Sequence, residues 1–259
     1  MLVKIFLTPL LILMCLLVAR RWGSFVGGVI SGPVSFFLTL EQGAAFSAAA
    51  SFNTLLGVLA CTATALIYPW LAAWGMPWFV ALPAALCGFF GGGWAVLHLP
   101  FTHLWAVVLS SLSPVLVLAC LPRVLARCKQ GHTLSAGVRV PIQMACGAGL
   151  VFAVTEAAHW LGPGWSGVLM FFPVMVCSIV PFAHATHGAP AVVSIFRGIM
   201  AGWFGCIAFA VVVMTGVEHL SLWLCYGLAS AAALLASTVV SLLEQRLQQR
   251  HAAGTEAES

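Results

Sequence analysis

Charge is almost absent from this 259-residue chain, and its few charged residues stand mainly between long apolar runs. Lys and Arg together number 10 and Asp and Glu number 6, so that 6% of the residues are charged and 62% are hydrophobic. A soluble domain carries about 25% charged residues, so this chain lacks the polar groups needed to cover a globular surface. Every acidic residue is Glu. The composition therefore predicts an all-α integral membrane protein and excludes nucleic-acid binders and enzymes built on Asp chemistry.

Nine apolar stretches are long enough to cross a bilayer as helices. A spanning helix needs about 20 apolar residues, with a range of about 17–25. Helix breakers or polar residues separate the stretches, as at Gly162-Pro163-Gly164. Three glycines at 91–93 are helix breakers that can end the fourth stretch early. The predicted spans are 3–20, 24–41, 46–72, 77–97, 101–121, 140–160, 165–183, 190–214 and 219–243.

The basic residues favour one orientation of these nine spans. Arg20 and Arg21 follow the first span, four basic residues follow the fifth within 122–139, and Arg246 and Arg250 follow the ninth. With nine spans all three groups fall on one side, which the positive-inside rule makes cytoplasmic. We therefore expect a multi-pass protein with its N-terminus outside and its C-terminus in the cytoplasm. The compact loops and the absence of soluble domains favour a bacterial inner membrane.

The two halves of the chain resemble each other weakly. Residues 52–61 align with 197–206 at an offset of 145, which we call the repeat offset, and Gln42-Gly43 then aligns with His187-Gly188. An odd number of spans separates the equivalent helices, so the two halves would be inverted, an arrangement common in secondary transporters. The expected organisation is a first four-helix repeat at 1–97, a connector helix and basic loop at 98–139, a second four-helix repeat at 140–245 and a cytoplasmic tail at 246–259.

Two short spans carry a proline near their middle, the second at Pro33 and the seventh at Pro173. Proline removes a helical hydrogen bond, and the freed backbone groups must be satisfied by protein or by water in a cavity. Matched breaks in two halves point to a midplane binding site, and ordinary proline kinks are the alternative. The residues predicted to line the site are Ser31, Gly32, Pro33, Ser35, Pro173, Cys177 and Ser178.

Polar residues near this site suggest what it would bind. Arg197 lies seven residues into the eighth span and predicts an anchor for a small anion or carboxylate, with snorkelling to lipid phosphate as the alternative. Asn53 would flank the site from the third span, or join helices as a buried amide. Glu41 and His187 are candidates for proton coupling, because they end the two broken spans and histidine titrates near physiological pH. Plain loop polarity at the interface is the alternative.

These features together predict a secondary permease or exporter that moves a small metabolite by alternating access. If Arg197 binds the metabolite, we expect it to be an anion. We expect no cofactor, metal or nucleic acid, and its partners would be the lipid bilayer, the substrate and either further copies or another membrane subunit. The chain holds none of the G-x-S-x-G, H-E-x-x-H or P-loop motifs, so we do not expect an enzyme. The alternatives are a non-transporting subunit of an envelope-biosynthesis or export complex, and a lipid-headgroup enzyme using 123–139 with His184 and His187.

Overall fold

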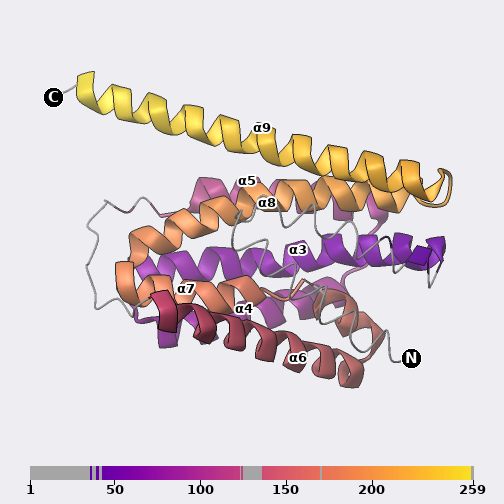
Figure 1. The fold of residues 1–259 in the computed structure, drawn as a ribbon, viewed down its shortest axis with the longest axis horizontal. Helices are drawn as coiled ribbons and strands as arrows, with labels where there is room; N and C mark the ends of the chain where they lie inside the picture. The colour runs from indigo at the N-terminus through magenta and orange to yellow at the C-terminus, as the bar shows by residue number, and fades with distance from the viewer. Residues whose placement is uncertain are drawn as a thin grey trace.

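The fold is a bundle of antiparallel helices, seen in a computed structural model that describes residues 36, 39–40, 43–122, 124, 136–169 and 171–257. These residues contain no strand. Figure 1 shows the helices lying side by side along one axis, with the C-terminal part of α9 extending beyond the others. The helices are α3 Ala44–Ala73, α4 Trp78–His98, α5 His103–Cys120, α6 Ala136–Leu169, α7 Val174–His187, α8 Ala189–Gly216 and α9 Leu222–Ala257.

Within the described part of the chain, five helices are long and apolar enough to cross a membrane: α3, α4, α5, α8 and the 222–243 part of α9. This finding confirms the expectation of a multi-pass α-helical membrane protein. Four of the predicted spans agree with α3, α4, α5 and α8 to within two residues at each end. The α4 helix continues through its three glycines. The first predicted span and almost all of the second lie outside the described residues.

The region of the sixth and seventh predicted spans differs from expectation. The loop expected at Gly162-Pro163-Gly164 lies inside α6, which is helical from Ala136 to Leu169. Figure 1 shows that α6 nevertheless changes direction sharply before it reaches α7, and a proline beside glycines is a physical cause of such a bend. The helical ladder is interrupted after Leu169, and α7 begins at Val174. The break in the seventh span is therefore real, and Pro173 precedes the new helix.

The helix α9 continues through most of the predicted C-terminal tail and runs without interruption to Ala257. At 1.5 Å per residue a 36-residue helix is about 54 Å long, which exceeds the roughly 30 Å of a bilayer core. The residues after 243 would therefore continue the helix beyond the hydrocarbon.

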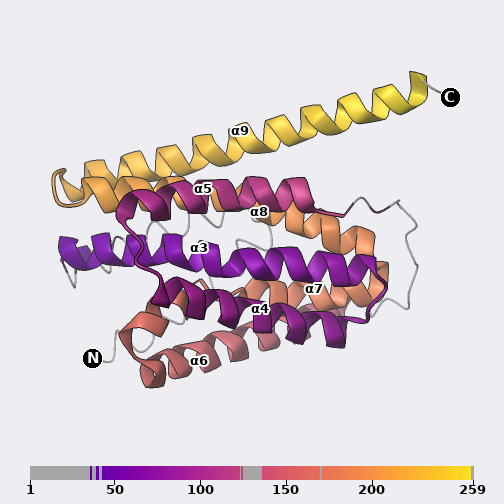
Figure 2. The same ribbon diagram turned by 180° about the vertical axis from the view of Figure 1, so that it is seen from behind.

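Two helices, α3 and α8, form the centre of the bundle. They pack against each other, α3 packs on α4, α8 packs on α9, and α5 contacts both central helices. Figure 2, which views the bundle from behind, shows α3 running between α5 and α4. Large apolar side chains of α4, α5 and α9 are exposed, among them Trp94, Leu112 and Leu235, as expected for helices that face lipid.

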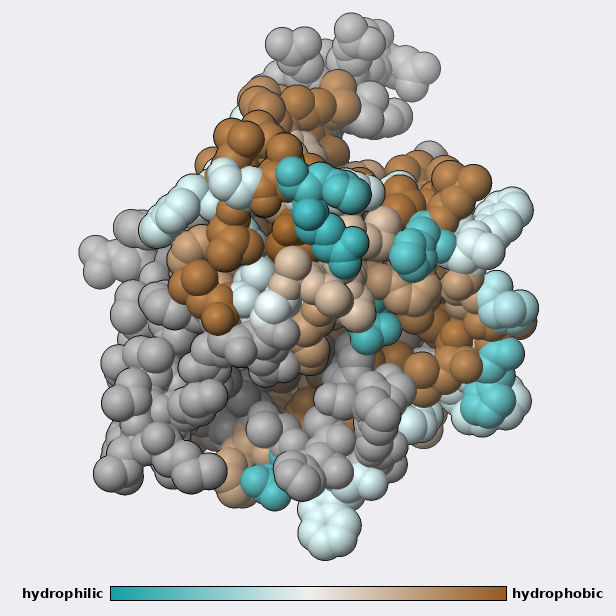
Figure 3. Space-filling view, turned by 90° about the vertical axis from the view of Figure 1, so that its right-hand side faces the viewer, coloured by the Kyte–Doolittle hydropathy of each residue, from teal (hydrophilic) through white to brown (hydrophobic). Residues whose placement is uncertain are grey.

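The two ends of the bundle are distinct. The ends of α3, α5, α7 and α9 lie on the left in Figure 1, and the starts of α3, α5 and α9 lie on the right. We call the left-hand end the C-terminal end and the right-hand end the opposite end. Figure 3 looks onto the opposite end and shows hydrophilic residues grouped there and bordered by hydrophobic side chains.

The repeat offset relates several features of the central helices. Both helices start directly after a glycine with positive φ, Gly43 at 91° before α3 and Gly188 at 74° before α8, and the offset carries the first glycine onto the second. A side chain on Gly92 of α4 would meet the Ala60 backbone of α3. The equivalent pair in the second half is Ser237 of α9 and Gly205 of α8, where a Cβ on the glycine would overlap the Ser237 hydroxyl.

Candidate functional site

The candidate site is the interruption between α6 and α7, at Phe171, Phe172 and Pro173. Tight turns replace the helical ladder there, with the Phe171 N–H donating to the Val168 carbonyl at 3.1 Å and the Val174 N–H donating to the Phe172 carbonyl at 2.7 Å. Pro173 has no N–H to donate, so it suits the position before a new helix. The Cys177 N–H donates to the Pro173 carbonyl at 3.0 Å, which starts the α7 ladder.

The break lies against the middle of α3. A backbone carbonyl that leaves a helix inside a membrane needs another donor, and the buried Cys61 thiol donates to the Phe171 oxygen at 3.1 Å. One helical turn earlier, Gly57 leaves room for Phe171, because a Cβ at Gly57 would overlap the Phe171 Cβ. The sequence of α3 therefore accommodates the break with a missing side chain and a thiol donor.

The break also lies against the middle of α8 and against α4. The rings of Phe171 and Trp203 of α8 are 5.9 Å apart, at 71° to each other. The Phe172 ring meets Phe89 of α4 at 5.4 Å in a nearly perpendicular arrangement. These edge-to-face contacts are favourable for aromatic pairs, so aromatic rings from three elements surround the freed backbone.

The predicted site residues on α7 lie beside this break. Pro173 is half-buried, and Cys177 and Ser178 are buried. The Ser178 hydroxyl donates to the Val174 carbonyl of its own helix at 2.8 Å. Ser178 faces α6, because a Cβ on Gly147 would lie 3.9 Å from its side chain. The other predicted lining residues, Ser31, Gly32, Pro33 and Ser35, lie outside the described residues.

Asn53 and Arg197 flank the break from opposite sides. Both are half-buried. Asn53 lies four residues before Gly57 on α3, about 6 Å along the helix axis, and Arg197 lies six residues before Trp203 on α8, about 9 Å. Because α3 and α8 run in opposite directions (Figure 1), Asn53 lies toward the opposite end and Arg197 toward the C-terminal end. The structure does not bring these two side chains together.

The structure describes only one of the two candidates for proton coupling. Glu41 lies outside the described residues. His187 is exposed at the end of α7, and the histidine that reaches the core is His184, one turn earlier. The His184 Nδ1 lies 3.4 Å from the hydroxyl of Tyr68 on α3, with the two rings 5.7 Å apart.

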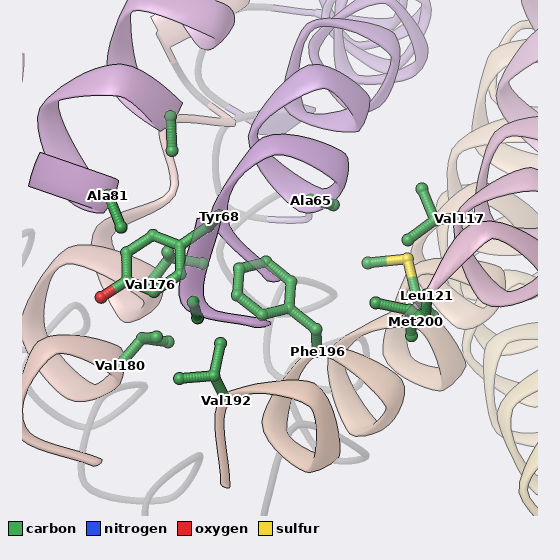
Figure 4. Packing of buried hydrophobic residues seen from close by; sticks show 12 residues of the cluster. Ala65, Tyr68, Ala81, Val117, Leu121, Val176, Val180, Val192, Phe196 and Met200 are labelled. Atoms are coloured by element: carbon green, nitrogen blue, oxygen red, sulfur yellow. The ribbon is translucent and has the colours of Figure 1, made fainter. Parts of the chain in front are cut away.

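Tyr68 is the residue that sequence reasoning missed. It is fully buried, and its ring lies 5.9 Å from that of Phe196 on α8. Figure 4 shows Tyr68 beside Phe196, in one cluster with the α7 valines Val176 and Val180, with its hydroxyl pointing away from Phe196. A signal was present, because the chain has only two tyrosines, and a buried tyrosine normally needs a hydrogen-bond partner.

A second polar contact lies at the opposite end of the bundle. Thr39, in the described fragment before α3, shares hydrogen bonds with the Ser47 hydroxyl of α3 and with the Tyr226 hydroxyl of α9. All three residues are buried. The rings of Phe36 and Tyr226 meet at 5.4 Å, nearly perpendicular. Both tyrosines of the chain therefore join helices through polar contacts.

The described residues hold no group of three or more His, Cys, Asp or Glu side chains that could bind a metal ion. No protein-family model, curated protein or solved structure matches this chain. Function is therefore inferred from the arrangement of the chain's own residues.

Proposed function

We propose that this protein is a secondary permease of two inverted repeats, which moves a small metabolite across a membrane by alternating access. The observation that carries the proposal is the break at Phe171–Pro173, which lies against the midpoints of both central helices. Discontinuous helices near the bilayer midplane form the binding sites of many secondary transporters. The bacterial inner membrane, with the C-terminus in the cytoplasm, remains part of this proposal.

The recurrence of the repeat offset supports the inverted repeat. The offset relates the glycine starts of α3 and α8, and it relates a close contact of α3 with α4 to a close contact of α8 with α9. Figure 1 shows that α3 and α8 run in opposite directions, as do α4 and α9. Opposite directions are expected for repeats related by an axis in the membrane plane. The connector would be α5, which contacts both central helices.

Arg197 supports an anion or carboxylate as the substrate. It is half-buried on α8, between the break and the C-terminal end of the bundle. A charged side chain in hydrocarbon costs at least about 2.5–3.5 kcal/mol, so such residues mark functional sites by default. A guanidinium in this position can bind a carboxylate or phosphate through two parallel hydrogen bonds. The thiols and aromatic rings at the break would then contact the uncharged part of the substrate.

The proposal is tested by comparing metabolites inside and outside cells that express wild-type protein or Arg197→Ala. Arg250→Ala, in the C-terminal part of α9, is the matched control because it removes the same charge far from the break. Membrane insertion must be equal in all three. We expect one small acid to change sides with wild type and Arg250→Ala but not with Arg197→Ala.

Two other results would contradict transport and indicate the alternatives. No difference in any soluble metabolite, with a partner protein that co-purifies, would favour a non-transporting subunit. A change in lipid composition that depends on His184 and His187 would favour a headgroup enzyme.

A further inference from the structure

Two polar contacts between helices lie at opposite ends of the bundle. Tyr68 and His184 meet at the C-terminal end, and Thr39 meets Tyr226 and Ser47 at the opposite end. We propose that these contacts are two gates, which close the central site from opposite faces of the membrane. This inference rests on the proposed transport function, because it assigns the residues that control access to the same site.

The repeat offset makes Thr39 the equivalent of His184. Each occupies the same place relative to the glycine that follows it: the Gly43 N–H donates to the Thr39 carbonyl at 2.9 Å, and the Gly188 N–H donates to the His184 carbonyl at 3.0 Å. Both residues are helical and lie four residues before the glycine that directly precedes a central helix. Each directs its side chain to a tyrosine of another helix.

The two contacts differ in their geometry. Thr39 forms a buried group of three hydroxyls with Ser47 and Tyr226, whereas the Tyr68 hydroxyl is 3.4 Å from the His184 nitrogen. Hydrogen bonds weaken as the distance grows beyond about 3.2 Å. His184 is also half-buried, whereas Thr39 and Tyr226 are buried. The contact at the opposite end is therefore the more deeply buried of the two.

Contacts of this kind are suited to gating because they are weak and separate. One hydrogen bond shifts an equilibrium between two conformations about three- to tenfold, which biases a two-state protein without locking it. Gly188, which has positive φ, joins α7 to the central helix α8, and Gly43, which also has positive φ, directly precedes the central helix α3. Such residues can absorb the backbone rotation of a hinge.

The gates are tested by sided labelling of Cys177, which is buried on α7 beside the break. Two preparations of sealed vesicles, right-side-out and inside-out, are treated separately with a membrane-impermeant maleimide. The labelled peptide is then quantified by mass spectrometry. Cys120, exposed as the last residue of α5, is the reference for the C-terminal end. This readout requires no substrate.

Removing one hydroxyl at a time should open one gate at a time. We expect Tyr68→Phe to raise Cys177 labelling from the C-terminal end about three- to tenfold, and Tyr226→Phe to raise it from the opposite end by a similar factor. His184→Leu should reproduce Tyr68→Phe, and His184→Gln, which keeps a hydrogen-bonding group, should label more like wild type.

Unchanged labelling in both tyrosine variants, or increases from the same end, would overturn the gates. This outcome is distinguishable from a failure of the transport proposal. If labelling responds as expected but no solute moves, the gates stand and transport fails. If transport depends on Arg197 but labelling does not respond, transport stands and the gates fail.

Discussion

The central helices α3 and α8 differ from α4, α5 and α9 in what surrounds them, although all five have similar hydropathy and length enough to span a membrane. In the most apolar stretch of each helix, 61% of α3 and 44% of α8 is buried in protein, against 22–28% of α4, α5 and α9. Lipid tails are as apolar as leucine, so apolarity alone does not draw one membrane helix to the centre of a bundle. The position of α3 needs another explanation.

Side chains that bond across helices distinguish α3 from α5. The Thr64 hydroxyl donates to the Ala85 carbonyl of α4 at 3.0 Å, and Cys61 and Tyr68 reach the break and α7. In α5, by contrast, the Ser110 and Ser113 hydroxyls donate to carbonyls of their own helix. The comparison indicates that small residues and cross-helix hydrogen bonds order these helices, and the following substitutions test it.

Removing a large side chain from the centre should have the greatest effect. Phe196 is 1% exposed on α8, whereas Phe79 is 61% exposed on α4. Phe196→Ala should destabilise the protein by about 3 kcal/mol because a cavity remains in the core, and Phe79→Ala by less than about 0.5 kcal/mol. Thermal unfolding of the purified protein in detergent measures both. Equal losses would mean that α8 is not central.

Adding a methyl group should also affect the stability of a central helix and of an outer helix differently. Gly57→Ala places a Cβ on Phe171, whereas Gly91 of α4 faces open space. We expect Gly57→Ala to cost about 1–3 kcal/mol through overpacking. Gly91→Ala should be neutral or stabilise by up to about 1 kcal/mol, since alanine is the better helix former. A neutral Gly57→Ala would show that the break does not pack tightly on α3.

The smallest expected effect is a difference in stability between variants at two threonines of α3. Thr64 donates to α4, whereas Thr62 donates to the Val58 carbonyl of its own helix at 3.1 Å. Thr64→Val should destabilise by about 0.6 kcal/mol, the average for hydrogen bonds between membrane helices. Thr62→Val should change stability by less, because its helix keeps its backbone ladder. Chemical unfolding of the two variants side by side resolves this difference.

Much of the helical layout was predictable from sequence, because hydropathy and helix breakers specify spans. The break beside Pro173 was also predictable, since proline cannot continue a hydrogen-bonded ladder. The packing of this break against Gly57 and Cys61 could not be predicted, because no local sequence pattern indicates which helix will supply the hydrogen-bond donor for a freed carbonyl. The loop expected at Gly162-Pro163-Gly164 is helical for a related reason: membrane helices tolerate proline and glycine where neighbouring groups satisfy the backbone.

The histidine that reaches the core lies one helical turn before the one predicted for proton coupling. His184 and His187 share a helix end, and sequence alone favoured the one at the glycine turn. The contact with Tyr68 depends on how α7 is placed relative to α3. The residues adjacent to Tyr68 and His184 in the sequence do not indicate this placement. Cys61 and Cys206 were recognised as equivalent positions, but the thiol bond to the Phe171 carbonyl appears only in three dimensions.

The most direct test of the transport proposal is counterflow in proteoliposomes that contain the purified full chain, using the acid identified in cells. Pro173→Ala restores the capacity for a continuous helix at the break, and Pro83→Ala, at an exposed proline inside α4, is the matched control. We predict saturable counterflow for wild type and Pro83→Ala and its loss in Pro173→Ala. Flux that rises in proportion to concentration without saturation, or that is equal in both proline variants, would contradict transport through the broken helix.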